Sequence, residues 1–180
     1  SEEGASVFGI QISNGVYGEW HQFGFIQHDP DTGVASQAAF REWLKNRYID
    51  EASMNTAWGE NGLMWESVSI PDSASREVVD CGVLRDPAKR GEVIDYFQFQ
   101  HEKLAEVIIN LSETVRESWS RPVITATFFG YFHNLFGRHA SGGHLAMDRI
   151  LASPHIDCFA GRNLTIRRLD RWAERDMRVD

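Results

Sequence analysis

The stretch VFGIQISNG, residues 7–15, is the first indication of the fold class of this 180-residue chain. Its first six residues are mostly apolar and include β-branched side chains, and Ser, Asn and Gly follow directly, which predicts a short buried strand that ends in a loop. Residues 123–129 have the same character, and residues 156–159, which include Asp157, are predicted to form another short strand. Continuous apolar runs are typical of strands buried on both faces, as in parallel sheets.

Helices are predicted between these runs. Residues 88–119 carry apolar side chains at spacings of three, four and seven, which marks the buried face of a long helix. Shorter helices are expected after an N-cap at Ser36, over residues 53–58 with Gly59 at the end, and over residues 144–151.

The alternation of strands and helices predicts an α/β fold with a parallel sheet, a pattern that barrels and doubly wound sheets both satisfy. No GxGxxG follows any predicted strand, which argues against a nucleotide-binding sheet. Residues 171–174 are expected to begin a further strand. Residues 61–86 have little periodicity, so we expect a long loop there, and such loops are usually functional.

The composition argues against several classes of partner. Hydrophobic residues make up 42% and charged residues 24% of the chain, which is typical of a folded globular protein. The net charge of -8 and the scattered basic residues argue against nucleic acid, because phosphate contacts need clustered Lys and Arg. No run is apolar for long enough to span a bilayer, so no membrane partner is expected.

No metal or other cofactor is predicted. Cys81 and Cys158 lie far apart without CxxC spacing, which indicates neither a zinc site nor a disulfide framework. His133, His139 and His144 lack the H-E-x-x-H spacing of a metal site, so structural roles are expected for them. The many aromatic residues could stack on sugar rings, although core packing is their default role.

Polar side chains follow each predicted strand, and in parallel α/β proteins the active site lies at the carboxyl ends of the strands. The first strand is followed by Asn14, Tyr17, Glu19, Trp20 and His21, the second by Tyr131, His133 and Asn134, the third by Asp157, Arg162 and Asn163, and the last by Glu174, Asp176 and Arg178. Glu19 and Glu174 are therefore carboxylates set beside aromatic and basic groups. Glycoside hydrolysis needs such a pair, because one carboxyl protonates the leaving oxygen and the other attacks the anomeric carbon.

Several of these segments resemble one enzyme family. IQISNGVYGEW, residues 10–20, resembles the fourth-strand segment of clan A barrel enzymes of the β-galactosidase type, related to glycoside hydrolase family 42. AFREWLKNRY, residues 39–48, and MNTAWG, residues 54–59, are similar to the family patterns F-x-x-W-L-x-x-x-Y and L-N-x-A-W-G, which is the most specific match. Weaker similarity covers residues 129–131, 143–144 and 153–157, and ERDMR, residues 174–178, resembles the E-x-D-x-R of the nucleophile.

The resemblance implies a partial (β/α)8 TIM barrel, roughly strands 4 to 7 of a longer catalytic domain, with residues 1–180 as a single-domain fragment of it. It implies a retaining glycoside hydrolase that cleaves a β-galactoside or a related glycoside. Glu19 is the implied acid/base, Glu174 is the implied nucleophile, and the implied substrate contacts are Asn14, Trp20, His21 and Tyr131.

The chain departs from the family pattern at two places. Clan A enzymes usually carry Asn directly before the acid/base Glu, whereas Gly18 precedes Glu19 and an Asn14-Gly15 pair comes earlier. If the register follows that pair, the acid is missing. The segment between residues 159 and 172 is also short for its loop, and a charged helical face is an alternative role for Glu174.

Two alternatives to the enzyme therefore stay open. One is a non-catalytic carbohydrate-binding protein on a degenerate barrel, which the Asn14-Gly15 register favours. The other is a structural fragment, because an open half barrel leaves strand edges unpaired. Unpaired edges also predict that the chain is part of a larger assembly, such as a homo-oligomer.

Overall fold

The computed structural model describes most of the chain, namely residues 3–15, 17–21, 31–82, 84–131, 142–161 and 164–167. The chain divides into two compact units, which are described separately. The first comprises Ser1–Phe23 and His101–Asp180, and the second comprises Gly24–Gln100. The boundary falls within the long helix α4 (Pro87–Ser118). Whether residues 1–180 act as a single domain stays a prediction.

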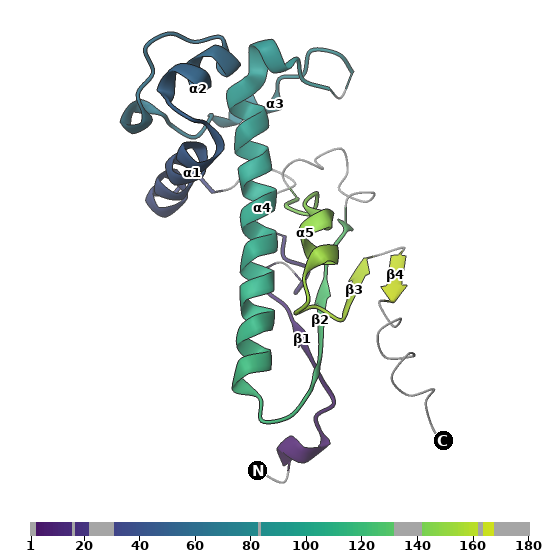
Figure 1. The fold of residues 1–180 in the computed structure, drawn as a ribbon. Coiled ribbons are helices and arrows are strands. Elements are labelled where there is room, and N and C mark those ends of the chain that lie inside the picture. The colour runs from purple at the N-terminus through teal and green to yellow at the C-terminus, as the bar shows by residue number, and fades with distance from the viewer. Residues whose placement is uncertain are drawn as a thin grey trace, which may run out of the picture. The chain divides into compact units, whose positions relative to one another are not determined.

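The first unit contains a four-stranded sheet in the order β1-β2-β3-β4 (Figure 1). Its strands are β1 (Gly9–Ile12), β2 (Ile124–Phe128), β3 (Cys158–Gly161) and β4 (Leu164–Arg167). The pairs β1–β2 and β2–β3 are parallel, as the three apolar runs predicted. The pair β3–β4 is an antiparallel hairpin, which the sequence pattern did not anticipate. The expected strand at residues 171–174 lies outside the described residues.

The core of the first unit joins the sheet to two helices. Ala105 and Ile108 of α4 and Ile150 of α5 (Met147–Ala152) are buried with Phe129, which directly follows β2, and Phe159 of β3. The short helix η1 (Glu3–Ser6) precedes β1. The mixed α/β architecture with a small parallel sheet agrees with the predicted fold class.

The second unit is helical. It contains α1 (Val34–Arg47), α2 (Glu51–Trp58), the 3-10 turn η2 (Trp65–Ser67), α3 (Ser73–Glu77) and the first part of α4, which is kinked at Arg90. The expectation of a continuous loop over residues 61–86 is wrong, because η2 and α3 lie within it. Both are too short to produce a helical repeat in the sequence. No helix in the part of the chain that the structure describes combines the length and the apolarity needed to cross a membrane.

The caps of two helices test the predicted boundaries. Gly33 caps α1, so Ser36 lies inside the helix and is buried, and the predicted N-cap is wrong. Helix α2 begins two residues earlier than predicted, because Asp50 accepts a hydrogen bond from the Ser53 N–H at 2.8 Å in a capping box. Gly59 ends α2 in the left-handed region with φ 70°, as predicted.

A buried carboxylate, Asp95 on α4, explains the most specific of the family-like patterns. Its Oδ2 accepts a hydrogen bond from the Tyr48 hydroxyl at 2.6 Å and another from the Trp58 indole N–H at 2.8 Å. Arg47 lies 3.0 Å from Oδ1 of the same carboxylate. Gly91 leaves room for this packing, because a Cβ there would lie 2.7 Å from the Trp58 ring. The spacing of Tyr48 and Trp58 therefore serves the packing of the second unit.

Candidate functional site

The loop that follows β1 has an unusual backbone. Gly15, Tyr17, Gly18 and Trp20 all have positive φ, at 72°, 57°, 76° and 64°. A left-handed conformation costs a non-glycine residue about 1–3 kcal/mol, and such strain is concentrated at functional sites. The Trp20 N–H donates to the Asn14 carbonyl at 2.8 Å, and the Gly18 N–H donates to the Gly15 carbonyl at 3.3 Å. These bonds hold the loop closed on itself.

Trp20 anchors the loop on the sheet. Its indole N–H donates to Thr127 Oγ1 of β2 at 2.8 Å and lies 3.3 Å from the carbonyl of Ile12, the last residue of β1. Trp20 is only 4% exposed and belongs to the core of the unit. Trp20 therefore positions the loop through its contacts with the sheet. A direct contact between Trp20 and a sugar stays a prediction, which the burial of Trp20 does not support.

Gly15 has a backbone conformation and surroundings that disfavour a side chain. A Cβ at Gly15 would lie 2.4 Å from the His21 carbonyl oxygen, which is closer than real contacts allow. Its φ of 72° also disfavours any residue with a side chain. This backbone therefore disfavours any residue other than glycine at position 15. Glu19 is the carboxylate in the described part of the loop, and its side chain is partly exposed.

The Glu19 carboxylate lies among polar groups from two strand ends. Its side chain is 30% exposed, and its Oε2 lies 3.8 Å from His21 Nε2. Tyr131, three residues beyond the end of β2, is buried. Burial, followed by the charge of Glu19 and hydrogen bonding to it, raises the pKa of Tyr131 to about 12. Tyr131 is therefore a neutral phenol that offers its O–H to Glu19.

Two buried imidazoles complete this group. His21 Nδ1 lies 3.3 Å from the Gly142 carbonyl, and burial lowers the pKa of His21, although the Gly142 carbonyl and Glu19 partly offset that effect. His144 Nδ1 accepts a hydrogen bond from the Gly130 N–H at 3.2 Å. Burial, followed by the nearby His21 and His101, lowers the pKa of His144 to about 3. Both rings are therefore largely neutral at pH 7.

We name Glu19, His21, Tyr131 and His144 the Glu19 cluster. The ring centroids of His21 and His144 are 4.6 Å apart, and each lies 5.3 Å from that of Tyr131. Three of the four side chains are buried, and only the Glu19 carboxylate is partly open to solvent. A carboxyl in such a setting can donate a proton to a bound substrate and take one back.

The structure brings together most of the predicted site residues that it describes. Glu19, Trp20, His21 and Tyr131 meet at the carboxyl ends of β1 and β2, as expected from their positions. Asn14 is exposed in the same loop, where its side-chain oxygen accepts the Gly15 N–H at 2.7 Å. Tyr17 is also exposed in this loop. Seven other predicted positions lie outside the described residues, namely Glu174, Asp176, Arg178, His133, Asn134, Arg162 and Asn163.

The position of Asp157 differs from the prediction, which placed it after the third strand. It comes before β3, which begins at Cys158. The Asp157 N–H donates to the Thr125 carbonyl at 3.0 Å, and the Thr125 N–H donates to Asp157 Oδ2 at 2.8 Å. Thr125 is the second residue of β2, so Asp157 lies at the amino ends of the strands, opposite the Glu19 cluster.

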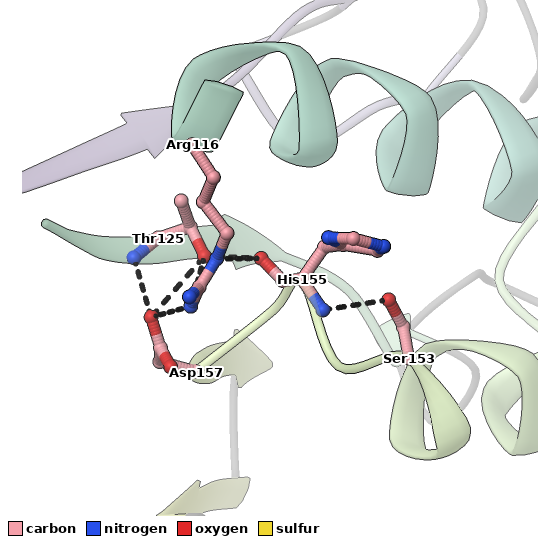
Figure 2. Close-up of polar contacts among 5 residues, drawn as sticks. All are labelled: Arg116, Thr125, Ser153, His155 and Asp157. Atoms are coloured by element: carbon pink, nitrogen blue, oxygen red, sulfur yellow. Dashed lines mark hydrogen bonds and ion pairs between the residues drawn. The ribbon is translucent and has the colours of Figure 1, made fainter. Parts of the chain in front are cut away.

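Asp157 has its own set of partners there. Figure 2 shows the Arg116 guanidinium extending from α4 to the Asp157 carboxylate and to the His155 carbonyl. The Thr125 hydroxyl also donates to the His155 carbonyl. We name Arg116, Thr125, His155 and Asp157 the Asp157 cluster. It ties the end of α4 to the starts of β2 and β3, which is a structural role.

Sequence reasoning missed the roles of His144 and Thr127. A structural role was expected for His144 and its burial agrees with that, but the sequence did not show that it accepts the Gly130 N–H just beyond β2 and packs on His21. Thr127 was read as one more β-branched residue of the strand. Thr125 and Thr127 are both buried in β2, and buried hydroxyl groups need hydrogen-bond partners. Two Thr residues at alternate positions of a predicted buried strand could therefore have indicated a polar role.

Comparison with known proteins adds two findings. The model of glycoside hydrolase family 42, described as beta-galactosidase, matches residues 6–160. Beta-galactosidase bgaB of Geobacillus kaustophilus is 26% identical over 102 residues, which are 54% of this chain and 14% of the length of that protein. The stretch matched by the family model includes β1, β2, all but the last residue of β3 and the Glu19 cluster, and it ends before Glu174.

Proposed function

Because the chain belongs to glycoside hydrolase family 42, we propose that it contributes the acid/base carboxylate of a glycosidase that cleaves a β-galactoside or a related glycoside. The observation that carries the proposal is the Glu19 carboxylate, which is partly exposed at the carboxyl ends of parallel strands and is bordered by Tyr131 and His21. That edge of a parallel α/β sheet is where catalytic groups are found.

The proposed mechanism is that of a retaining enzyme. Glu19 protonates the glycosidic oxygen as the bond to the anomeric carbon breaks, and it later takes a proton from the attacking water. Glu174 is the proposed nucleophile on the strength of the E-x-D-x-R resemblance alone. Retaining enzymes hold the two carboxyls about 5–5.5 Å apart. A measured separation well above that range would exclude the pairing.

Three of the proposed substrate contacts belong to side chains at the same edge. Asn14 is exposed in the loop, and Tyr131 and His21 border Glu19. Trp20 supports the loop that carries Asn14 and Glu19, so its effect on the substrate is proposed to be mainly indirect. The proposed ligand is a glycoside or an oligosaccharide.

We also propose that β1, β2 and β3 correspond to strands 4 to 6 of a (β/α)8 barrel and that residues 1–180 are part of one catalytic domain. Their parallel order supports this, as does a relative that is much longer than the matched stretch. A homo-oligomer is the other arrangement that would cover the sheet edges. Sedimentation velocity distinguishes a monomer from such an assembly.

A carbohydrate-binding protein without turnover is the second candidate. The observation that favours it is Gly15, which follows Asn14 where clan A enzymes usually carry the acid. The backbone at Gly15 cannot hold a side chain, so this loop has diverged from that pattern. In this case Glu19 would accept hydrogen bonds from sugar hydroxyls and would not transfer a proton.

Replacement of Glu19 by Gln tests the proposal. We expect hydrolysis of methyl β-D-galactoside, a poor leaving group, to fall by about 10²–10⁴-fold, because general acid catalysis typically contributes that much. Hydrolysis of 2,4-dinitrophenyl β-D-galactoside should fall far less, since its leaving group needs no proton. Steady-state kinetics on both substrates gives the comparison.

The matched control is Glu113→Gln. Glu113 also lies beside a histidine, 3.5 Å from His155, but it is partly exposed on α4 and away from the Glu19 cluster. It should leave both rates unchanged. Equal losses on the two substrates in Glu19→Gln would rule out the acid role. Saturable galactoside binding by a wild-type protein that hydrolyses neither substrate would favour the second candidate.

A further inference from the structure

We propose that Tyr17 is a specificity-determining residue, whose exposed aromatic ring stacks on the sugar attached to the leaving oxygen. This inference rests on the proposed function and deepens it. It concerns the aglycone, which is the part of the substrate that Glu19 would protonate and release. The preferred substrate is then one whose leaving group is itself a sugar.

The loop after β1 carries two aromatic residues at positive φ, and they differ in burial. Trp20 has φ 64° and is 4% exposed, and its indole N–H donates to Thr127 Oγ1 of β2. Tyr17 has φ 57° and is 89% exposed. The ring of Trp20 therefore holds the loop on the sheet, whereas the ring of Tyr17 is accessible to a ligand.

The backbone at Tyr17 indicates that its side chain has a use. A left-handed φ strains a bulky residue but not glycine, and this loop has glycine at two other left-handed positions, Gly15 and Gly18. The exposed ring of Tyr17 regains little of this cost by packing, because most of its surface stays in water. Residues in strained conformations are concentrated at active sites and ligand contacts. The ring of Tyr17 is therefore expected to contact a ligand.

The loop itself holds the backbone of Tyr17 in place. The Gly18 N–H donates to the Gly15 carbonyl at 3.3 Å, which closes a tight turn that contains Tyr17. The Trp20 N–H donates to the Asn14 carbonyl at 2.8 Å, which joins the two sides of the loop. A contact residue on a backbone that is already fixed lowers the entropy cost of binding.

The position of Tyr17 selects the aglycone. Tyr17 and Glu19 are two residues apart, and two residues span at most about 7 Å even when fully extended. Both side chains reach solvent, since Tyr17 is 89% exposed and the Glu19 side chain is 30% exposed. The acid of a glycosidase contacts the oxygen that joins the two parts of the substrate. A ring this close to the acid can reach the sugar on the leaving side of that oxygen.

Tyrosine has the chemistry that a sugar contact needs. The C–H bonds of a pyranose form an apolar face, on which the face of an aromatic ring can pack. Tyrosine also supplies a large contact area at a low conformational cost, because only two side-chain torsions are fixed. Asn14 is exposed in the same loop, where an amide can bind the hydroxyl groups of such a sugar.

Two galactosides that differ in the leaving group test the proposal. Lactose carries a glucose ring there, and methyl β-D-galactoside carries none. We expect Tyr17→Ala to lower kcat/KM for lactose by about tenfold, the effect of one lost stacking contact, and to change kcat/KM for methyl β-D-galactoside far less. Tyr17→Phe keeps the ring and should keep most of the activity on lactose. Equal losses on both substrates in Tyr17→Ala would overturn the role in the aglycone site.

Calorimetry gives a second measurement that needs no turnover. Glu19→Gln is expected to bind both sugars without rapid hydrolysis. Addition of Tyr17→Ala to this variant should raise the Kd of lactose by about tenfold and change the Kd of methyl β-D-galactoside far less. An unchanged Kd for lactose would contradict the stacking contact.

Phe8→Ala is the matched control. Phe8 is 79% exposed, but it directly precedes β1 and so lies at the amino end of the strand. Its loss should leave kcat/KM for both galactosides as it is. Tyr17→Gly checks for a structural role, and it should not lower Tm, because glycine adopts this φ without strain. A marked fall in Tm in Tyr17→Gly would show that the ring supports the fold, against the proposal.

Failure of the proposed function would look different. A wild-type protein that neither binds nor hydrolyses either galactoside would contradict the proposed function and the role of Tyr17 with it. A wild-type protein that hydrolyses both galactosides, with full kcat/KM for lactose in Tyr17→Ala, would leave the proposed function standing and overturn the role of Tyr17 alone.

Discussion

Asp157 and Glu19 lie at opposite ends of the same parallel strands, and their partners differ in charge. Asp157 faces the Arg116 guanidinium and accepts the Thr125 N–H, so its charge is compensated. Glu19 faces the neutral phenol of Tyr131 and the largely neutral imidazole of His21. A compensated carboxylate holds structure together, whereas a carboxylate with neutral partners keeps the freedom to exchange a proton.

The same division appears in the backbone. The Asp157 cluster lies where strands begin, and its bonds join α4 to the sheet (Figure 2). The Glu19 cluster follows the ends of strands, in a loop with positive φ at two non-glycine residues, Tyr17 and Trp20. The contacts that stabilise the fold thus lie at the amino ends of the strands, and the strained loop lies at their carboxyl ends, as in other parallel α/β proteins.

The largest expected effect separates the two carboxylates. Glu19→Gln should cost about 10²–10⁴-fold in hydrolysis of a poor leaving group and little stability, because its partners are neutral and it is partly exposed. Asp157→Asn should do the reverse, with a loss of about 2 kcal/mol in the free energy of unfolding, because a hydrogen-bonded ion pair with Arg116 is broken. Urea denaturation and steady-state kinetics on both variants measure the loss of stability and the loss of activity. If both variants lost activity and stability to the same extent, the two carboxylates would not have different roles.

The next effect is a pH dependence of stability. The pKa of His144 is about 3 in the folded protein, against an ordinary value near 6.5, because its ring is buried. Below about pH 6.5 the unfolded chain takes up a proton that the folded chain refuses, so stability is lost as the pH falls toward 3. His144→Gln should reduce this slope by up to about 1.4 kcal/mol per pH unit.

Urea denaturation at several pH values between 6.5 and 4 measures the slope. His155→Gln at the Asp157 cluster is the control, because the His155 side chain is partly exposed and lies beside Glu113. If the two histidine variants had the same slope, buried His144 could not be the source of the acid sensitivity.

The smallest effect concerns the anchor of the loop. Trp20→Phe keeps an aromatic ring but removes the N–H that donates to Thr127 Oγ1. We expect a loss of about 1 kcal/mol in the free energy of unfolding, the net value of a buried hydrogen bond, together with a higher KM as the loop loosens. Unfolding and kinetics measured on the same preparation check both parts. A change in KM without any loss of stability would favour direct sugar contact by Trp20.

Local patterns in the sequence predicted much of the scaffold. The periodicity over residues 88–119 matches α4 within one residue at each end, and the three apolar runs became β1, β2 and β3. Gly59 was recognised as a helix end because glycine adopts positive φ without strain. The short elements η2 and α3 were not predicted, since three or five residues are too few to show helical periodicity.

The candidate site was predicted in part. Glu19, His21 and Tyr131 were expected to meet because they follow adjacent parallel strands, and they do. Asp157 was predicted inside a strand over residues 156–159 and was nevertheless counted among the groups at the carboxyl end of that strand. The strand β3 begins at Cys158, so Asp157 directly precedes it and lies at the amino end of the sheet.

What the sequence by itself determined is the α/β alternation, the loop that carries Glu19 and the family to which the chain belongs, because each depends on residues close together along the chain. Only the tertiary structure decided that Trp20 is buried, that His144 packs on His21 and that Asp157 pairs with Arg116. Trp20 and Thr127 are 107 positions apart, and Arg116 and Asp157 are 41 apart. Such contacts depend on how strands and helices pack in space, and local periodicity carries no information about them.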